Sequence, residues 1–142
     1  MNDKLLKDAD KSGIYHLPPA RRSSVVKAAS KLKLTVLVAD ITTCKTATDA
    51  FQELGNALHF PIWFGANFDA LYDCLTDPDW QPGKGHVVLI DGIEHLRQAE
   101  PEDFATLIEV FQAASEARRA TGSPFWILLD TPARGVAALP EA

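Results

Sequence analysis

Apolar residues gather in four short runs that predict strands. The runs cover residues 13–17, 34–39, 86–91 and 125–129, and Pro18 ends the first of them. The runs do not alternate between apolar and polar residues, which is typical of strands buried on both faces of a parallel sheet.

Helical spacing predicts four helices between these strands. They cover residues 20–31, a segment capped by Thr46 or Thr48 that runs through Leu58, residues 67–76, and a long helix from Pro101 to Gly122. Helical crossovers between strands imply parallel pairing. We therefore expect an α/β fold with a small, mostly parallel sheet. Residues 1–11 are polar, and we expect them to be frayed.

The predicted helix at residues 67–76 has two contrasting faces. Asn67 is a good N-cap, because its side-chain oxygen can accept a hydrogen bond from the next turn. An apolar stripe for the core and a polar stripe beside it follow from the spacing: Phe68, Leu71 and Leu75 on one face, and Asp69, Tyr72, Asp73 and Thr76 on the other. Two carboxylates on one exposed face repel each other, so the arrangement favours a basic partner.

The charges of the chain are divided unevenly along the sequence. Residues 1–45 hold nine basic and four acidic residues, whereas residues 46–142 hold five basic and fifteen acidic residues. One interpretation is a solvated acidic surface that aids solubility. The other is a negative patch that steers a positively charged protein. Nucleic acid is a poor direct ligand, because its phosphates would be repelled.

Length and composition indicate one globular domain in the cytoplasm. The chain has 142 residues, no apolar run near 18 residues, and a charged N-terminus without the apolar stretch of a signal peptide. We therefore expect no membrane association. Cys44 and Cys74 have no metal-ligand spacing and are expected to be free thiols, with Cys74 in the core.

The common catalytic motifs are absent from the sequence. It has no nucleotide-binding glycine loop, no nucleophile elbow and no zinc-protease motif, and its four histidines are not paired at helical spacing. We expect no metal site. Asp91-Gly92 and Asp130-Thr131 follow predicted parallel strands, where active sites of α/β sheets often lie, so a small hydrolase or phosphotransferase stays a minor alternative.

Residues 61–76 resemble the signature of the barstar family, the intracellular inhibitors of barnase-type ribonucleases. The shared pattern is a proline, an aromatic pair and Gly-x-Asn-x-Asp-Ala-Leu-aromatic-Asp-Cys-Leu-Thr, which this chain matches from Pro61 to Thr76. The similarity covers roughly residues 34–130. We expect residues 1–33 to be an N-terminal extension that adds one strand and one helix, and residues 34–142 to be the barstar-like domain.

The resemblance implies a non-enzymatic inhibitor that plugs a ribonuclease active site with the acidic helix and the preceding loop. No cofactor is required. Asp69 and Asp73 would stand in for RNA phosphates, and Trp63 would pack on the catalytic histidine of the enzyme. The remaining contacts implied by the resemblance are Phe64, Gly65, Asn67, Tyr72 and, as a further contacting tryptophan, Trp80.

Within residues 61–76, three positions differ from the best-known inhibitor of the family, and Ala113 stands where that inhibitor has a glutamate on its later helix. Trp63 replaces a tyrosine, Phe64 lacks a second hydroxyl, and Ala66 stands where an acidic residue is found. The partner we expect is a basic extracellular-type ribonuclease or a related toxin, which would make this chain an immunity protein. The main alternative is a binding module of the same fold for a toxin or regulator that is not a ribonuclease.

Overall fold

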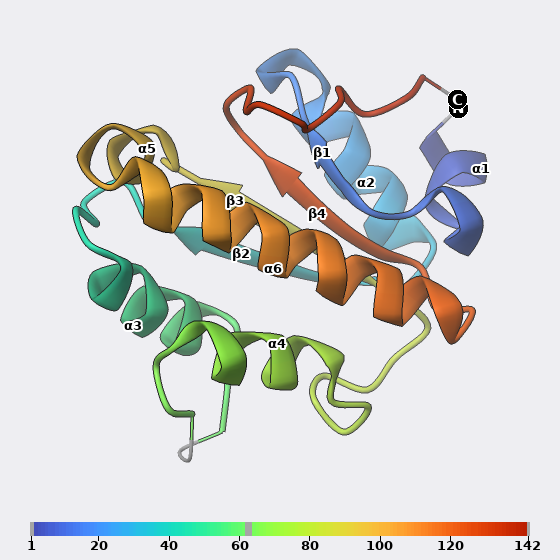
Figure 1. The fold of residues 1–142 in the computed structure, drawn as a ribbon. Coiled ribbons are helices and arrows are strands. Elements are labelled where there is room, and N and C mark those ends of the chain that lie inside the picture. Colours follow the sequence, from blue (N-terminus) through green and yellow to red (C-terminus); the bar gives the residue numbers. More distant parts are fainter. Residues whose placement is uncertain (1, 62–63, 142) are drawn as a thin grey trace.

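A computed structural model describes residues 2–61 and 64–141 and contains a four-stranded sheet in which every strand is parallel (Figure 1). The strands are β1 (Ile14–His16), β2 (Thr35–Asp40), β3 (His86–Asp91) and β4 (Phe125–Leu129), in the order β1-β4-β3-β2. The expected α/β class and the four strands predicted from the sequence are confirmed.

The depth of each strand in the sheet explains its sequence. The two central strands, β3 and β4, are buried along almost their whole length, which requires their continuous apolar runs. The expectation of burial on both faces is wrong for β2, which lies at an edge of the sheet and alternates between buried and exposed residues in its second half. At the other edge, β1 pairs with β4, with Ile14 opposite Ile127.

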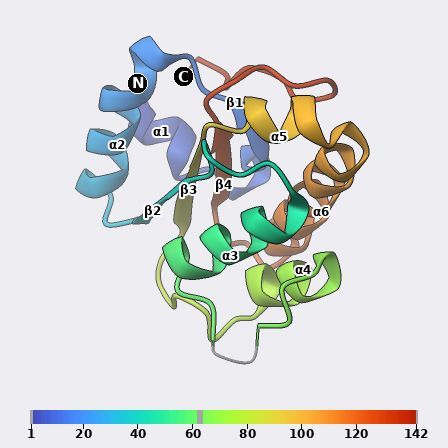
Figure 2. The ribbon, with the colours of Figure 1, turned by 90° about the vertical axis from the view of Figure 1, so that its left-hand side faces the viewer.

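Helices cover both faces of the sheet, so that the molecule has three layers (Figure 2). One face carries α1 (Asn2–Leu6) and α2 (Arg22–Lys31). The other carries four helices and the larger core: α3 (Ala47–Ala57), α4 (Phe68–Thr76), α5 (Glu94–Ala99) and α6 (Pro101–Ala120).

Local capping chemistry sets the ends of the predicted helices. Of the two candidate caps for α3, Thr46 is the one used, and its hydroxyl accepts a hydrogen bond from the Asp49 N–H. Pro101 begins α6, as expected from its lack of an N–H group. The short helices α1 and α5 and two single-turn 3-10 helices, at Ala9–Lys11 and Pro19–Arg21, were not expected.

The expectation that residues 1–11 are frayed is wrong for residues 2–11, the part of this segment that the structure describes. Leu5 and Leu6 of α1 are 4% and 0% exposed, and they pack in the smaller core with α2. The Trp126 indole N–H donates a 3.1 Å hydrogen bond to the Leu6 carbonyl. Two apolar residues in a charged segment are therefore enough to anchor it, because a buried tryptophan of β4 lies beneath them.

Both cysteines are buried free thiols, as expected. Burial, with a smaller effect of nearby carboxylates, raises the pKa of Cys44 to about 11, and the pKa of Cys74 is raised for the same reasons. A raised pKa disfavours the reactive thiolate, so neither cysteine is a nucleophile at neutral pH. Within the described residues, no helix is long and apolar enough to cross a membrane.

Candidate partner-binding site

The polar face of α4 is the candidate site. The loop before α4 contains the N-cap residue that sets where the helix begins. The Asn67 carboxamide oxygen accepts a 2.8 Å hydrogen bond from the Ala70 N–H, and its NH2 group contacts the Gly65 carbonyl at 3.3 Å. Asn67 is thus the N-cap that the sequence predicted. Ala66 has a left-handed backbone with φ of 52°, which is uncommon for a residue with a Cβ atom.

Asp69 and Asp73 are exposed on one face of α4. The three ion pairs among the described residues involve other carboxylates, and neither aspartate side chain accepts a hydrogen bond there. On the opposite face, Leu71 and Leu75 are fully buried against the core. Packing therefore fixes the orientation of the helix, while two carboxylates remain available to a partner.

The C-terminal end of α4 is held by Arg118, a buried arginine of α6. Its Nε–H donates a 2.7 Å hydrogen bond to the Leu75 carbonyl, and an Nη2 hydrogen is donated to the Asp77 carbonyl at 3.0 Å. A cation at this position also suits the negative end of the helix dipole. Burial lowers the pKa of Arg118, and the nearby Asp77 carboxylate partly offsets that effect.

Arg118 also closes an aromatic cluster beneath the loop that follows α4. Its guanidinium carbon lies 5.7 Å from the centre of the Trp80 ring and 5.3 Å from that of Phe125. Arg118 was not among the residues expected at the site. The spacing predicts only that its side chain points inward, because it follows Phe111 of the apolar stripe by seven residues, and not which groups it contacts.

Trp80 does not lie on the surface, where we expected it to contact a partner. It is 5% exposed, its indole N–H donates a 2.7 Å hydrogen bond to the Leu58 carbonyl, and its ring stacks on that of His86 at 5.6 Å. The turn-rich sequence around it indicated exposure, but the packing of α6 and β3 covers the ring. Trp80 is therefore not part of the exposed surface around α4.

The other predicted contact residues lie in or beside the loop at the start of α4. Gly65 and Asn67 are exposed, and Tyr72 is half-buried on the helix. Phe64 is half-buried, with its ring 4.9 Å from that of Phe60. Trp63 lies outside the described residues, so its role as an anchor stays a prediction.

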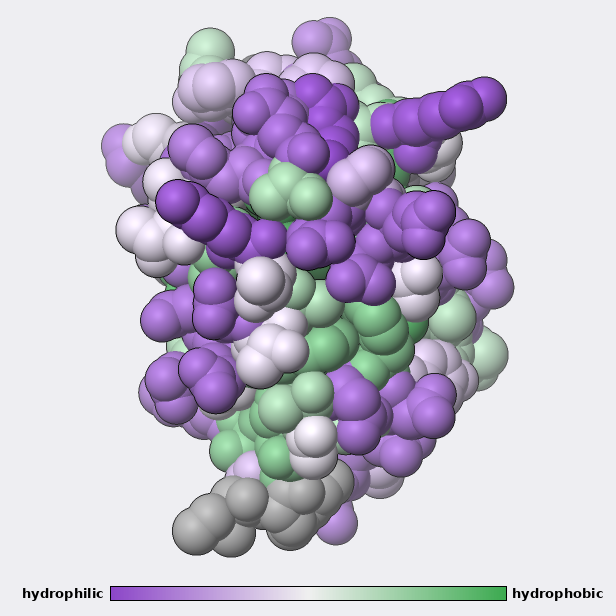
Figure 3. Space-filling view, turned by 60° about the vertical axis from the view of Figure 1, so that its left-hand side comes forward, coloured by the Kyte–Doolittle hydropathy of each residue, from purple (hydrophilic) through white to green (hydrophobic). Residues whose placement is uncertain are grey.

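An apolar hollow adjoins this loop. It has a volume of about 410 Å³ and lies between α3 and the start of α4, lined by Phe51, Gln52, Gly55, Asn56, Phe60, Pro61, Phe64 and Ala66. Figure 3 shows apolar surface gathered on one face of the molecule. An acidic helix beside an apolar hollow has the mixed character of protein–protein interfaces.

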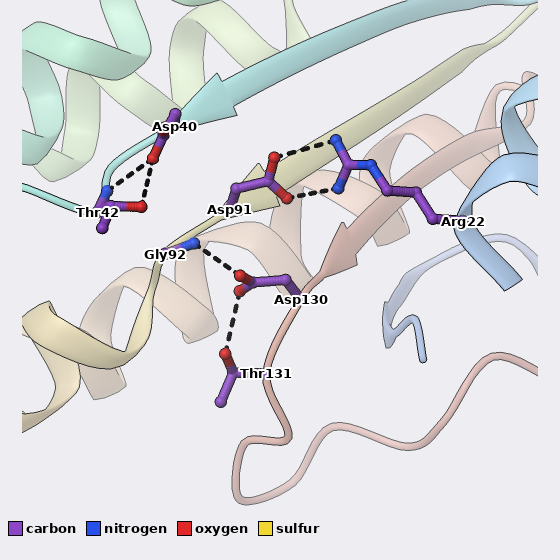
Figure 4. Close-up of polar contacts among 7 residues, drawn as sticks. All are labelled: Arg22, Asp40, Thr42, Asp91, Gly92, Asp130 and Thr131. Carbon is purple, nitrogen blue, oxygen red and sulfur yellow. Dashed lines mark hydrogen bonds and ion pairs between the residues drawn. The ribbon is translucent and has the colours of Figure 1, made fainter. Parts of the chain in front are cut away.

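A second group of carboxylates lies at the carboxyl ends of the strands, where an enzyme site was the minor alternative (Figure 4). Asp91 accepts two hydrogen bonds from the Arg22 guanidinium, at 2.6 and 3.0 Å. Asp130 accepts hydrogen bonds from the Gly92 N–H at 2.9 Å and from the Thr131 hydroxyl at 3.0 Å. The Asp40 carboxylate bonds to Thr42, which lowers the pKa of Asp40.

Each of these carboxylates already has a partner within the fold: Asp91 binds α2 through Arg22, Asp130 joins the ends of β3 and β4, and Asp40 bonds within its own turn. The adjoining cavity is small, about 220 Å³, and largely lined by apolar residues together with Arg22, Asp91 and Asp130. In the described part of the chain, no three His, Cys, Asp or Glu side chains are placed to hold a metal ion. The arrangement is that of a structural network, whereas the carboxylates of α4 have no such partners.

Comparison with solved structures shows a likeness of fold. Two structures of the ORC2 protein of Aeropyrum pernix, one of ADPNP-ADP complexes and one in the ADP form, match with TM-scores of 0.60 and 0.57 at 20% and 18% sequence identity. Each match covers 96% of this chain, which spans 38% of the length of the ORC2 chain. At such low identity the likeness concerns the α/β architecture alone.

Comparison with family models gives a more specific result. No curated protein matches the chain. The model described as Barstar (barnase inhibitor), however, matches residues 34–130, from just before β2 to just after β4. These residues include α4, both of its caps and its two exposed carboxylates. Because the match extends over more than half of the sequence, the chain belongs to the barstar family.

Proposed function

We propose that this protein inhibits a basic, barnase-like ribonuclease by placing the exposed face of α4 in the enzyme's active site. The observation that carries the proposal is the pair Asp69 and Asp73, which are exposed and whose side chains have no hydrogen-bond or ion-pair partner among the described residues. Membership of the barstar family supports inhibition in general, and the acidic helix supplies the mechanism.

Carboxylates suit this task because a ribonuclease binds the phosphates of RNA with cationic side chains. Aspartates on successive turns of a helix lie near each other on one face and can meet such cations together. The wider charge distribution favours the same partner, because residues 46–142 carry ten more acidic than basic residues. A negative surface of this kind steers a cationic protein and speeds its association.

The helix is rigidly supported, which reduces the entropy lost on binding. Asn67 caps its N-terminus and Arg118 binds the carbonyls at its C-terminal end. Preorganisation of this type improves affinity, because fewer groups need to be ordered when the complex forms. We propose that Gly65 and Tyr72 extend the contact surface around the two aspartates, and that Trp63 anchors the loop.

Isothermal titration calorimetry with barnase and with other basic extracellular ribonucleases tests the proposal. Asp69→Ala and Asp73→Ala should each weaken binding by about 2 kcal/mol or more, as residues in the centre of an interface do. This loss of binding free energy is the value typical of central residues in protein interfaces, and barnase–barstar is one of the interfaces on which it is based. Asp10→Ala is the matched control, because it removes an exposed carboxylate near the N-terminus, distant in sequence from α4. This variant should bind like the wild type.

Two results would contradict the proposal. Equal affinity of the two α4 variants and the wild type would show that the acidic face is not the contact. Failure of the wild type to bind any of these ribonucleases would favour the alternative, a barstar-like module whose partner is a different toxin or a regulator.

A further inference from the structure

The strand β2 leaves one edge of the sheet open. Among the described residues it pairs only with β3, through hydrogen bonds that include Thr35 N–H to the Gly85 carbonyl and Ile41 N–H to the Asp91 carbonyl, both at 2.9 Å. Main-chain groups of a strand point alternately to its two sides. Odd-numbered residues of β2 therefore bond to β3, and the N–H and C=O groups of Val36, Val38 and Asp40 point away from the sheet.

This edge lacks the features that usually protect an open strand. In natural proteins, edge strands are protected from pairing with another chain by a lysine, a proline, a bulge or a covering segment. The strand reads Thr-Val-Leu-Val-Ala-Asp, and Val38 at its middle is 46% exposed, the one large apolar residue of the described chain in that state. Its single charge, Asp40, lies at the end and bonds back to Thr42.

We propose that β2 is a self-association site, at which β2 of a second copy of this chain pairs in antiparallel orientation about a two-fold axis at Val38. A two-fold axis normal to the sheet keeps corresponding faces on the same side, so a residue can oppose only residues whose number has the same parity. Centring on Val38 places Val38 opposite Val38 of the second copy, and Val36 opposite its Asp40.

This register gives every outward-pointing N–H and C=O group of β2 a hydrogen-bond partner. All three outward-facing residues form hydrogen-bonded pairs, and the exposed valines cover each other across the axis. The two Asp40 carboxylates lie four residues apart along the strand direction, about 14 Å at ~3.4 Å per residue. That separation exceeds the ~10 Å Debye length at 0.1 M salt, so their repulsion is largely screened.

Self-pairing is a separate property from the proposed inhibition. In Figure 2, α3 lies between β2 and α4, so the edge and the acidic face are different surfaces. A failure to bind ribonuclease would therefore not contradict self-association through β2. A failure to self-associate would likewise not contradict inhibition through α4.

Sedimentation velocity over a concentration series tests the association. The wild-type mass should rise from 15.5 kDa towards twice that value as concentration increases. Val38→Lys should weaken association about ten-fold or more, because two ammonium groups would meet at the axis. Ala105→Lys, which adds the same charge at an exposed position of α6, should associate like the wild type.

Oxidative cross-linking tests the register. Val38→Cys should form a disulfide-linked dimer, since Cα atoms of a hydrogen-bonded antiparallel pair lie about 5.5 Å apart. Asp40→Cys is exposed in the same strand, but its two copies would be too far apart to link. A mass of 15.5 kDa at every concentration, unchanged association of Val38→Lys, or equal cross-linking of the two cysteine variants would overturn the proposal.

Discussion

Replacement of Arg118 by methionine should destabilise the protein and loosen the end of the acidic helix. Methionine keeps most of the length and apolar surface of the arginine stem but removes the guanidinium that binds the Leu75 and Asp77 carbonyls. Both hydrogen bonds come from a charged donor, and the Leu75 carbonyl is left in a buried environment.

The expected loss of stability is about 2–4 kcal/mol. A hydrogen bond to a charged group contributes about 1.5–3 kcal/mol, and an unpaired buried carbonyl costs about 1–3 kcal/mol. Part of this loss is offset, because the variant no longer buries a charge, as Arg118 does at 8% exposure. The contact with the Trp80 and Phe125 rings is also lost.

Urea unfolding measures the loss, with Arg119→Met as the control. Arg119 is the next residue of α6 and is half-buried, and its side chain makes no hydrogen bond or ion pair in the described part of the chain. Hydrogen exchange should also show faster exchange in the last turn of α4 of the Arg118 variant. Equal unfolding free energies for the two methionine variants would refute the assignment of Arg118 as the support of this helix.

Three further predictions concern single residues. Burial lowers the pKa of His86, so the unfolded state binds more protons than the folded state below pH ~6.5. The free energy of unfolding should therefore fall as the pH falls, by at most about 1.4 kcal/mol per pH unit. Urea unfolding at a series of pH values from 8 to 5 should show a weaker dependence of this free energy on pH for His86→Phe than for the wild type. Asn67→Ala should cost about 1 kcal/mol of unfolding free energy through loss of the cap, and a variant as stable as the wild type would argue against the cap. Trp63→Ala should weaken ribonuclease binding by roughly 2–4 kcal/mol, mainly through faster dissociation in stopped-flow measurements; a wild-type dissociation rate would show that Trp63 is not an anchor.

The sequence predicted the parts of the fold that are determined locally. The strands at β3 and β4 have long apolar runs, and α4 has both a capping residue and a clear division into two faces. The identity of the cap and the exposure of Asp69 and Asp73 followed from helical geometry alone. Local chemistry and tertiary packing agree at these places, and the agreement makes them predictable.

The errors occur where distant packing decides the outcome. Leu5 and Leu6 lie in a charged segment too short to show a period, and their burial depends on Trp126 at the other end of the chain. Trp80 follows a turn-rich sequence, yet α6 and His86 cover it. The role of Arg118 depends on the proximity of α6 to α4, which no single segment of the sequence encodes.

The central claim is that the acidic face of α4 occupies a ribonuclease active site, and inhibition of turnover tests it most directly. The initial rate of RNA cleavage by a basic, barnase-like ribonuclease should fall to near zero at an equimolar amount of this protein. A higher substrate concentration should raise the apparent inhibition constant, because substrate and inhibitor compete for one site. Replacement of Asp69 and Asp73 together by asparagine, which keeps the side-chain size, should remove most of the inhibition. Full enzymatic activity in the presence of excess wild-type protein, or equal inhibition by the double variant, would contradict the account.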